Sequence, residues 1–507
     1  MRHGLGTRPL NALVALPSFF VLGYSQSSLG GLVKFDDFKL HFPQCTDPTI
    51  QGITVSSYTL GAALGAFATF YLGNRLGRRR SAMLGATVAI VGLVLQASSF
   101  ALAQLILGRV LVGLGVGIQS ATVPVWQSEL SIVSSKRGAL VIFDGICLAL
   151  GIASAAWVNL GFSFIGGRSA LAWRLPSALP LVPMLVSLAA SALVLESPRW
   201  LLSVHREERA REGIATLLNA RSGATQVDEY ARAEPSLWKL VRPDDGCPPR
   251  LRTRAALAVV TQAFQQLSGG GLISYYSGTL FSQLGFDATE TRVLSATALT
   301  FKLVCTLIPF LLIERLGRRR LLIVSGAGMA SVLVVLVITS AYSSARGAVY
   351  VSTACIYLFN LFLPIGFLGV NYLYCAEIAP QTYRAPISAL STGVHWCGNF
   401  IVAMVTPVGF ASLSWGYYII FTVIASAIVP TVYFFFPETS GLSLEEIDDF
   451  FAELRREHTP PSRVMGADDA CDVELVGSSG GGDDVDAKVR SSSSSSSERV
   501  YASFPKV

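Results

Sequence analysis

The stretch GNRLGRRR, residues 73–80, recurs with little change as IERLGRRR at residues 313–320. An apolar segment precedes each copy and another follows it, so each copy reads as a short loop whose glycine allows a tight turn. Basic residues at a membrane surface would account for the arginines, but they would not require the shared order Arg-Leu-Gly-Arg-Arg-Arg. The repeat therefore predicts two similar halves, arranged in parallel about an axis along the membrane normal.

The composition places the chain in a membrane. Of its 507 residues, 51% are hydrophobic and only 14% are charged, whereas soluble domains carry about 25% charged residues. The formal net charge of +6 gives no reason to expect nucleic-acid binding, because the basic residues cluster at the ends of apolar segments. The eight cysteines form no Cys-x-x-Cys pair or Cys/His cluster, so we expect neither a metal site nor a cofactor.

Twelve apolar segments approach or exceed the length of about 20 residues that a helix needs to cross the bilayer. They are residues 10–31, 51–73, 82–100, 102–123, 139–161, 176–195, 255–283, 293–313, 321–341, 348–374, 386–408 and 414–436. The pattern predicts an all-α membrane protein of twelve transmembrane helices in two pseudo-symmetric halves of six. The first half is residues 1–195 and the second is residues 255–440.

The remaining segments are polar. The central loop, residues 196–254, is charged, and its stretch REERAREGIATLLN has the spacing of a surface helix, so we expect a cytoplasmic loop with short helices. The tail, residues 441–507, ends in Gly-, Asp- and Ser-rich sequence. Such a composition buries too little apolar area to offset chain ordering, which predicts disorder beyond about residue 456.

The distribution of basic residues sets the orientation. With the N-terminus placed inside, the inner segments before the tail hold 24 Lys and Arg residues, and the outer loops hold six. This bias predicts that both termini are cytoplasmic. The six outer residues are Lys34, Lys39, Arg168, Arg174, Arg292 and Arg346.

The stretch QQLSGGGLISYYSG, residues 265–278, is a polar island in the seventh apolar segment. Polar side chains at this depth need water, a ligand or a partner helix. For Gln265 and Gln266, a ligand and hydrogen bonding between helices are both open.

Seven motifs occur in the order typical of one family. They are NRLGRRR, GRVLVGLGVGIQSATVPVWQSEL, ESPRWLL, QQLSGGGLISYY, ERLGRRR, AEIAPQTYR and PETSGLSLEEID. From about residue 23 to about residue 446 the chain resembles the sugar porter family of the major facilitator superfamily. The stretches AWRLP and YSGTLF are similar to its fungal sugar and polyol branch.

The resemblance implies a secondary transporter that carries a sugar or polyol by alternating access. A nutrient sensor that does not transport, and that signals through its cytoplasmic segments, is the alternative. The sequence shows no nucleophile–base pair and no nucleotide-binding loop, so we expect no enzyme activity. The implied partners are a small sugar or polyol, protons where transport is coupled, and the lipid bilayer. We expect a monomer in the plasma membrane.

The resemblance also implies a substrate site on the seventh, tenth and eleventh segments. Its residues would be Gln265, Gln266, Gly271, Tyr275, Tyr276, Tyr372, His395, Trp396 and Asn399. Gly271 stands where the family has an asparagine, and Gly145 stands where it has a glutamine. These glycines predict a wider pocket or a closer approach of the backbone to the ligand.

Glutamates near the inner ends of the fourth and tenth segments can pair with the repeated arginines. We expect two charge networks at the inner face that form in one state of the transport cycle and break in the other, with simple anchoring at the membrane interface as the alternative. The predicted members are Arg75, Arg78, Arg79, Arg109, Glu129 and Arg137 in the first half, and Arg315, Arg318, Arg319, Glu377 and Arg384 in the second.

Proton-coupled members of the family carry an aspartate where this chain has Ser25, in GYSQSS. Because serine does not titrate, facilitated diffusion and proton symport both stay open. His395, which titrates nearest physiological pH, and Asp144 are candidate proton carriers. A neutral His395 that hydrogen-bonds the substrate or another helix is the alternative. Lys302 is a third ionisable residue at membrane depth, where such groups are costly.

Overall fold

The computed structural model describes residues 7–130, 137–165, 170–218, 250–342, 345–380, 383–442 and 444–457. Throughout these ranges the regular elements are helices, which confirms the predicted all-α class. The predicted disorder beyond residue 456 concerns a tail that lies outside the described residues from residue 458 onward.

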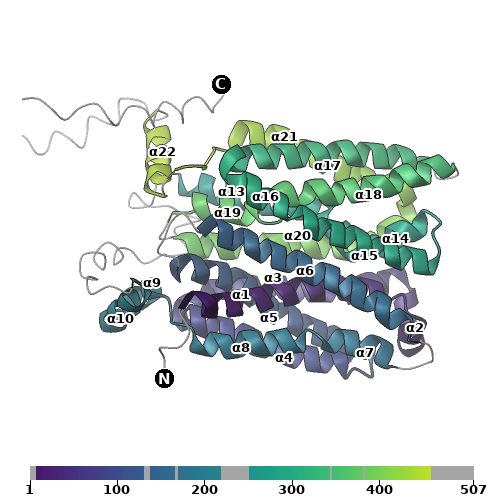
Figure 1. Ribbon diagram of the computed structural model, residues 1–507, viewed down its shortest axis with the longest axis horizontal. Coiled ribbons are helices and arrows are strands. Elements are labelled where there is room, and N and C mark those ends of the chain that lie inside the picture. Colours follow the sequence, from purple (N-terminus) through teal and green to yellow (C-terminus); the bar gives the residue numbers. More distant parts are fainter. Residues whose placement is uncertain are drawn as a thin grey trace, which may run out of the picture.

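The helices of the first half lie side by side and run roughly antiparallel (Figure 1). They are α1 (Thr7–Leu32), α3 (Pro48–Leu76), α4 (Arg78–Ala97), α5 (Leu102–Leu130), α6 (Arg137–Ser163), α7 (Leu171–Ala178) and α8 (Leu181–Leu193). Two short elements, α2 (Asp36–His41) and η1 (Pro43–Thr46), connect α1 to α3.

The second half lies beside the first (Figure 1). Its elements are α13 (Leu251–Gln265), the π-helical segment η3 (Gln266–Gly270), α14 (Gly271–Gln283), α15 (Ala288–Cys305), α16 (Leu307–Leu316), α17 (Arg318–Ala341), α18 (Arg346–Phe367), α19 (Val370–Ile378), α20 (Arg384–Leu413), the 3-10 turn η5 (Ser414–Gly416) and α21 (Tyr417–Phe435). The short helices α9 (Pro198–Ser203), α10 (Glu207–Leu218) and α22 (Leu444–Glu457) lie at the end of the molecule opposite α2. We call these the inner end and the outer end.

The described helices account for all twelve predicted segments. Ten stretches are long and apolar enough to cross a membrane, and the last of them, Arg384–Phe435, holds both α20 and α21. These stretches therefore hold eleven of the predicted segments. The twelfth is the seventh segment along the chain, which is not among the ten stretches and corresponds to α13, η3 and α14, where Gly269 has a non-helical φ of +102°. The chain is therefore an integral membrane protein of twelve spans, in the part that the structure describes.

The repeated arginine motif is a turn of a single residue rather than a loop. Gly77, with φ +84°, separates α3 from α4, and Gly317, with φ +83°, separates α16 from α17. The three arginines after each glycine form the first turn of the next helix. A positive φ that L side chains rarely adopt explains why glycine stands at this point in both copies.

Close backbone contacts join the two halves. A Cβ at Gly30 of α1 would lie 2.0 Å from the carbonyl oxygen of Tyr275, and a Cβ at Gly145 of α6 would lie 2.2 Å from that of Leu368. Small residues permit such packing between transmembrane helices. The prediction that Gly145 widens the pocket is therefore corrected, because this position is filled by the backbone between α18 and α19.

Replacing Gly317 by alanine is expected to lower the thermal stability of the purified protein. A Cβ there would lie 2.5 Å from a carboxylate oxygen of Glu438, and the backbone region costs about 1–3 kcal/mol for residues other than glycine. Gly285→Ala is the matched control, because Gly285 has φ +88° but nothing within 4 Å of its Cβ position. If both variants lose the same amount in thermal unfolding, the contact with Glu438 contributes nothing.

Candidate functional site

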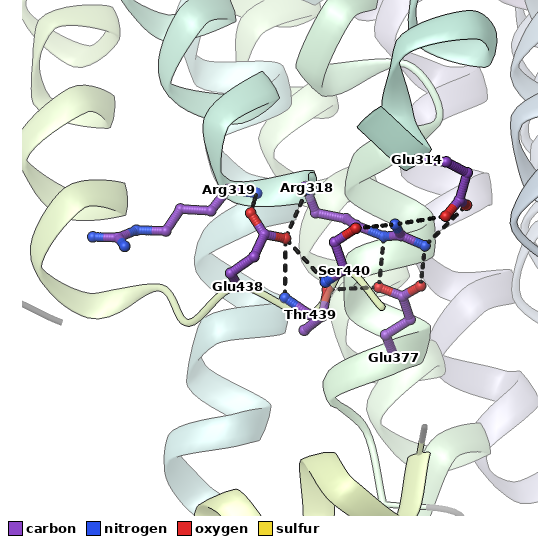
Figure 2. A network of polar contacts seen from close by, with 7 residues as sticks. All are labelled: Glu314, Arg318, Arg319, Glu377, Glu438, Thr439 and Ser440. Carbon is purple, nitrogen blue, oxygen red and sulfur yellow. Dashed lines mark hydrogen bonds and ion pairs between the residues drawn. The ribbon is translucent and has the colours of Figure 1, made fainter. Parts of the chain in front are cut away.

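Arg318 is the centre of a charge network at the inner end of the second half (Figure 2). Its guanidinium donates Nε to Glu377 Oε2 at 3.1 Å and Nη2 to Glu377 Oε1 at 2.9 Å. This two-point geometry is the strong form of an arginine–carboxylate pair. Thr439 Oγ1 donates to the same carboxylate at 2.7 Å, and the Arg318 guanidinium also donates to Ser440 Oγ at 3.1 Å.

A second carboxylate, Glu438, binds the backbone of the same turn. It accepts from the N–H groups of Arg318 at 2.8 Å and Arg319 at 3.1 Å, and from those of Thr439 at 3.0 Å and Ser440 at 3.1 Å. The first N–H groups of a helix have no partner within the helix, and the helix dipole favours a negative charge there. Glu438 therefore caps α17 and fixes the turn from which the Arg318 side chain reaches Glu377.

The first half repeats this arrangement. Arg78 donates Nε and Nη2 to the two carboxylate oxygens of Glu129, both at 3.0 Å. Glu196 accepts from the backbone N–H groups of Arg78 at 2.9 Å and Arg79 at 3.0 Å, and so caps α4. Each half thus joins the first turn of its third span to its fourth span and to the segment after its sixth span.

Glu196 and Glu438 are the functional residues that sequence reasoning missed. Both lie within quoted motifs, ESPRWLL and PETSGLSLEEID, and each follows the last apolar segment of its half. A glutamate at the same place in both halves was the signal from which a shared role could have been inferred. The partners of these carboxylates are backbone N–H groups, which leave no mark in the sequence.

The other predicted members of the networks are placed differently. Arg75 stacks over the Tyr71 ring at 4.1 Å, and Arg384 donates Nε to the carbonyl oxygen of Ala376 at 3.1 Å. Arg315 is exposed. The guanidinium groups of Arg79 and Arg319 donate to the carbonyl oxygens of Ala192 and Tyr433 respectively. Arg137 begins α6, but its side chain lies outside the described part of the chain.

Arg109 corrects the prediction, because the structure does not bring it to the inner face. It lies 20 residues before Glu129 on α5, which is about 30 Å along a helix. The buried Arg109 guanidinium donates to the carbonyl oxygen of Val55 at 3.0 Å and lies 5.4 Å from the centre of the Tyr58 ring. It belongs to the outer side of the central region.

Buried amides meet at the break between α13 and α14. Asn371 Nδ2 donates to Gln265 Oε1 at 2.6 Å and to Gln262 Oε1 at 3.2 Å. His395 Nδ1 lies 3.1 Å from the same Gln262 oxygen, and its Nε2 lies 2.9 Å from Gln266 Nε2. An amide oxygen only accepts and an amide nitrogen only donates. These contacts therefore fit a neutral imidazole that donates from Nδ1 and accepts at Nε2.

Several polar atoms in this region have no hydrogen-bond partner among the described residues. They include Gln266 Oε1, Asn371 Oδ1 and both side-chain polar atoms of Asn399. Buried polar atoms are nearly always paired in native proteins, so the unpaired Gln266 Oε1 and Asn399 Oδ1, which lie together beside Gly271, mark a place for a polar ligand. A Cβ at Gly271 would lie 2.9 Å from Gln266 Oε1 and 3.3 Å from Asn399 Oδ1, so Gly271 keeps this place open.

Aromatic residues connect the amide region to its surroundings. Trp396 Nε1 donates to Ser120 Oγ of the first half at 3.1 Å, and its ring meets Tyr58 edge to face at 5.8 Å. Tyr276 donates its hydroxyl to the carbonyl oxygen of Ala403 at 2.7 Å. The ring of Tyr372 lies 5.9 Å from that of His395. Tyr275 lines a cavity that lies further toward the outer end.

Two predicted ionisable residues at membrane depth are not paired with each other. Asp144 accepts from Gln127 Nε2 at 3.3 Å, whereas Lys302 Nζ donates to Ser274 Oγ at 2.9 Å. Both side chains are buried. Each therefore depends on a neutral partner in the described part of the chain.

Two six-helix halves around a buried polar site, with equivalent charge networks at one end, define a secondary transporter of the major facilitator type. A family model described as "Sugar (and other) transporter" matches residues 10–451. The chain belongs to this family, and it is a transporter rather than an enzyme.

Relatives are similar over most of their length. The sugar transporter STL1 of Saccharomyces cerevisiae is 33% identical over 476 residues, which cover 89% of this chain and 82% of that protein. The glucose transporter GlcP of Staphylococcus epidermidis is 30% identical over 430 residues, which cover 84% of this chain and 93% of that protein.

The fold is that of a solved symporter. XylE, a proton:xylose symporter solved with 6-bromo-6-deoxy-D-glucose, superposes with a TM-score of 0.75 at 21% identity, over 88% of this chain and 99% of that chain. XylE from E. coli in a partially occluded inward open conformation gives a TM-score of 0.71, over 86% of this chain and 99% of that chain.

Glu377→Gln is expected to reduce transport at least about tenfold while the protein still reaches the membrane, because the charged two-point bond to Arg318 is lost. Glu314→Gln is the matched control. Glu314 contacts the same guanidinium at 3.4 and 3.5 Å, but its side chain is 67% exposed. Initial uptake rates, normalised to surface expression, measure both variants. Equal losses would contradict a special role for Glu377.

Proposed function

We propose that this protein carries a sugar or polyol across the membrane by alternating access of one central site. The observation that carries the proposal is the set of buried, unpaired amide atoms around Gln266, Asn371 and Asn399, where the helix break opens the seventh span. Hydroxyl groups both donate and accept, so they can satisfy amide oxygens and nitrogens together. Names of relatives such as "Sugar transporter STL1" support the same class of solute.

The charge networks support a mechanism in which the two halves rock about that site. Each network ties helices within one half and draws the inner ends of its helices together. Breaking a partly buried arginine–carboxylate pair is costly, so the networks favour the state in which they are formed. We place the substrate residues Gln265, Gln266, Gly271, Tyr275, Tyr276, Tyr372, His395, Trp396 and Asn399 at the centre of this cycle.

We also propose that the protein works in the plasma membrane as a monomer, with both termini in the cytoplasm. The excess of basic residues in the segments assigned to the inner end supports this orientation. Facilitated diffusion is the simpler coupling scheme, because Ser25 cannot titrate and both ring nitrogens of His395 face amides. Proton symport, for which Asp144 remains a candidate, is its competitor.

Gln266→Ala is expected to abolish saturable uptake, because the side chain supplies both the contact with His395 and the unpaired oxygen Oε1. Gln283→Ala, at the exposed outer end of the same span, is the matched control and should transport normally. Counterflow of labelled sugars and polyols in proteoliposomes measures both. Binding without counterflow in the unaltered protein would instead identify a sensor.

His395→Asn tests whether the histidine positions Gln266 or carries a proton. We expect a raised KM with an unchanged dependence of uptake on pH, because a neutral ring only orients the amide. Uptake with and without a protonophore, measured across a pH series, separates the two roles. A pH dependence that is present in the unaltered protein and disappears in the variant would assign proton coupling to His395.

A further inference from the structure

A cavity of about 410 Å³ opens between α1, α6, α14 and α15 on the outer side of the amide region. Its volume lies within the range of small-molecule sites, about 300–1,000 Å³. Three cationic side chains line it, namely Lys34, Lys39 and Arg292, and none of the described residues that line it is a carboxylate. The cavity is therefore strongly positive.

The ammonium group of Lys34 lies beside Gly278 and Ser295, which both line the cavity. Its Nζ lies 3.5 Å from the place that a Cβ would take at Gly278, where Ser295 Oγ is also within 3.7 Å. The pKa of Lys34 is lowered to about 8, first by burial and then by the nearby charges of Lys39 and Arg292. A bound anion would relieve this repulsion.

Lys302 continues the positive surface toward the centre. It lies three residues beyond Leu299, which lines the cavity, and so one turn deeper on the same face of α15. Its side chain is buried, and its Nζ hydrogen bond goes to the neutral Ser274 Oγ at 2.9 Å. Among the described residues no carboxylate lies within 4.0 Å of Lys34, Arg292 or Lys302.

Buried cations at the inner end of the molecule behave differently. Arg78 pairs with Glu129, Arg254 with Asp448 and Arg318 with Glu377. Buried charges are costly unless they are paired, so the buried ammonium group of Lys302, which has a neutral partner in Ser274, indicates a function. Lys34, Lys39 and Arg292 are also three of the six basic residues of the outer loops, where such residues are disfavoured.

We propose that this cavity and Lys302 recognise a carboxylate, so that the transported solute is a sugar acid, a polyhydroxylated carboxylate, rather than a neutral sugar. The amides of the central site bind its hydroxyl groups, and the cations on the outer side bind and attract its carboxylate. This inference rests on the proposed function, because it names the solute class of the same transport pathway. It also gives the unpaired ammonium groups a partner of opposite charge.

Uptake of labelled D-gluconate and D-sorbitol into proteoliposomes tests the inference, because both are six-carbon polyols and only gluconate is charged. The unaltered protein should take up gluconate with a KM at least about tenfold lower than that for sorbitol, the scale of a charged hydrogen bond. Lys302→Met should remove most of this preference, and Lys302→Arg should retain it. Arg346→Gln, which removes an exposed outer charge remote from the cavity lining, is the matched control and should change nothing.

The failures of the two ideas are distinguishable. The sugar-acid assignment is wrong, and the transport function stands, if sorbitol or glucose is taken up with a KM equal to that of gluconate. The same conclusion follows if Lys302→Met keeps the preference for gluconate while the variant remains monodisperse in detergent. If no sugar, polyol or sugar acid shows uptake or counterflow, the proposed function itself fails and the assignment falls with it.

The pH dependence adds a second readout in the same experiment. As the outer pH rises through about 8, Lys34 loses its proton, so the KM for gluconate should rise while that for sorbitol stays constant. The other charged or titratable groups on the cavity are Lys39, whose partner Asp36 lies at 4.0 Å, together with Arg292 and Tyr275. In Lys34→Gln the pH dependence should disappear. A dependence that persists there contradicts the role of Lys34.

Discussion

The carboxylate caps on α4 and α17 are the contacts on which the transport machinery depends. A helix that starts at the membrane surface exposes N–H groups without partners, and unsatisfied backbone groups are costly in a low-dielectric environment. Glu438 satisfies two of these groups on α17 and two more on its own segment. Because the cap fixes the first turn of α17, the Arg318 guanidinium is held within hydrogen-bond distance of the Glu377 carboxylate. Glu438 thus orients Arg318, and Glu377 accepts its hydrogen bonds.

The two halves use the same plan but differ in one residue contact. The arginine–glutamate distances are nearly equal, 3.0 and 3.0 Å in the first half against 3.1 and 2.9 Å in the second. The residues after the capping glutamates differ in their use. Ser197 Oγ caps the short helix α9, at 3.3 Å from the N–H of Trp200, whereas Thr439 Oγ1 donates to Glu377. The two equivalent hydroxyl residues therefore serve different groups, the start of α9 in the first half and the network glutamate in the second.

The sequence predicted what depends on apolar length and on repeated motifs. The twelve segments follow from runs of hydrophobic residues, and the pairing of Arg318 with Glu377 follows from complementary charges at equivalent places. Arg109 was misplaced because it was grouped with Glu129 in one motif, although the 20 residues of helix between them correspond to about 30 Å. The caps could not be predicted, because every residue except proline has a backbone N–H group and the sequence does not show which of these groups a carboxylate binds. The amide contacts of Asn371 with Gln262 and Gln265 depend on how α13 and α19 face each other, which periodicity does not reveal.

The arrangement of the central site depends on the imidazole ring of His395 and on the absence of a side chain at Gly271. The neutral tautomer of His395 accepts at Nε2, so the Gln266 amide must turn its nitrogen toward the ring and its oxygen away. That oxygen is unpaired, and it faces the Cβ position of Gly271 at 2.9 Å. Any larger residue at Gly271 would occupy the place where a hydroxyl group can donate to the amide oxygen. Gly271 stands where the family has an asparagine, but the site does not simply lose a contact there. The glycine leaves Gln266 Oε1 exposed as an acceptor, and the hydrogen bond of Gln266 to His395 sets the orientation of that oxygen.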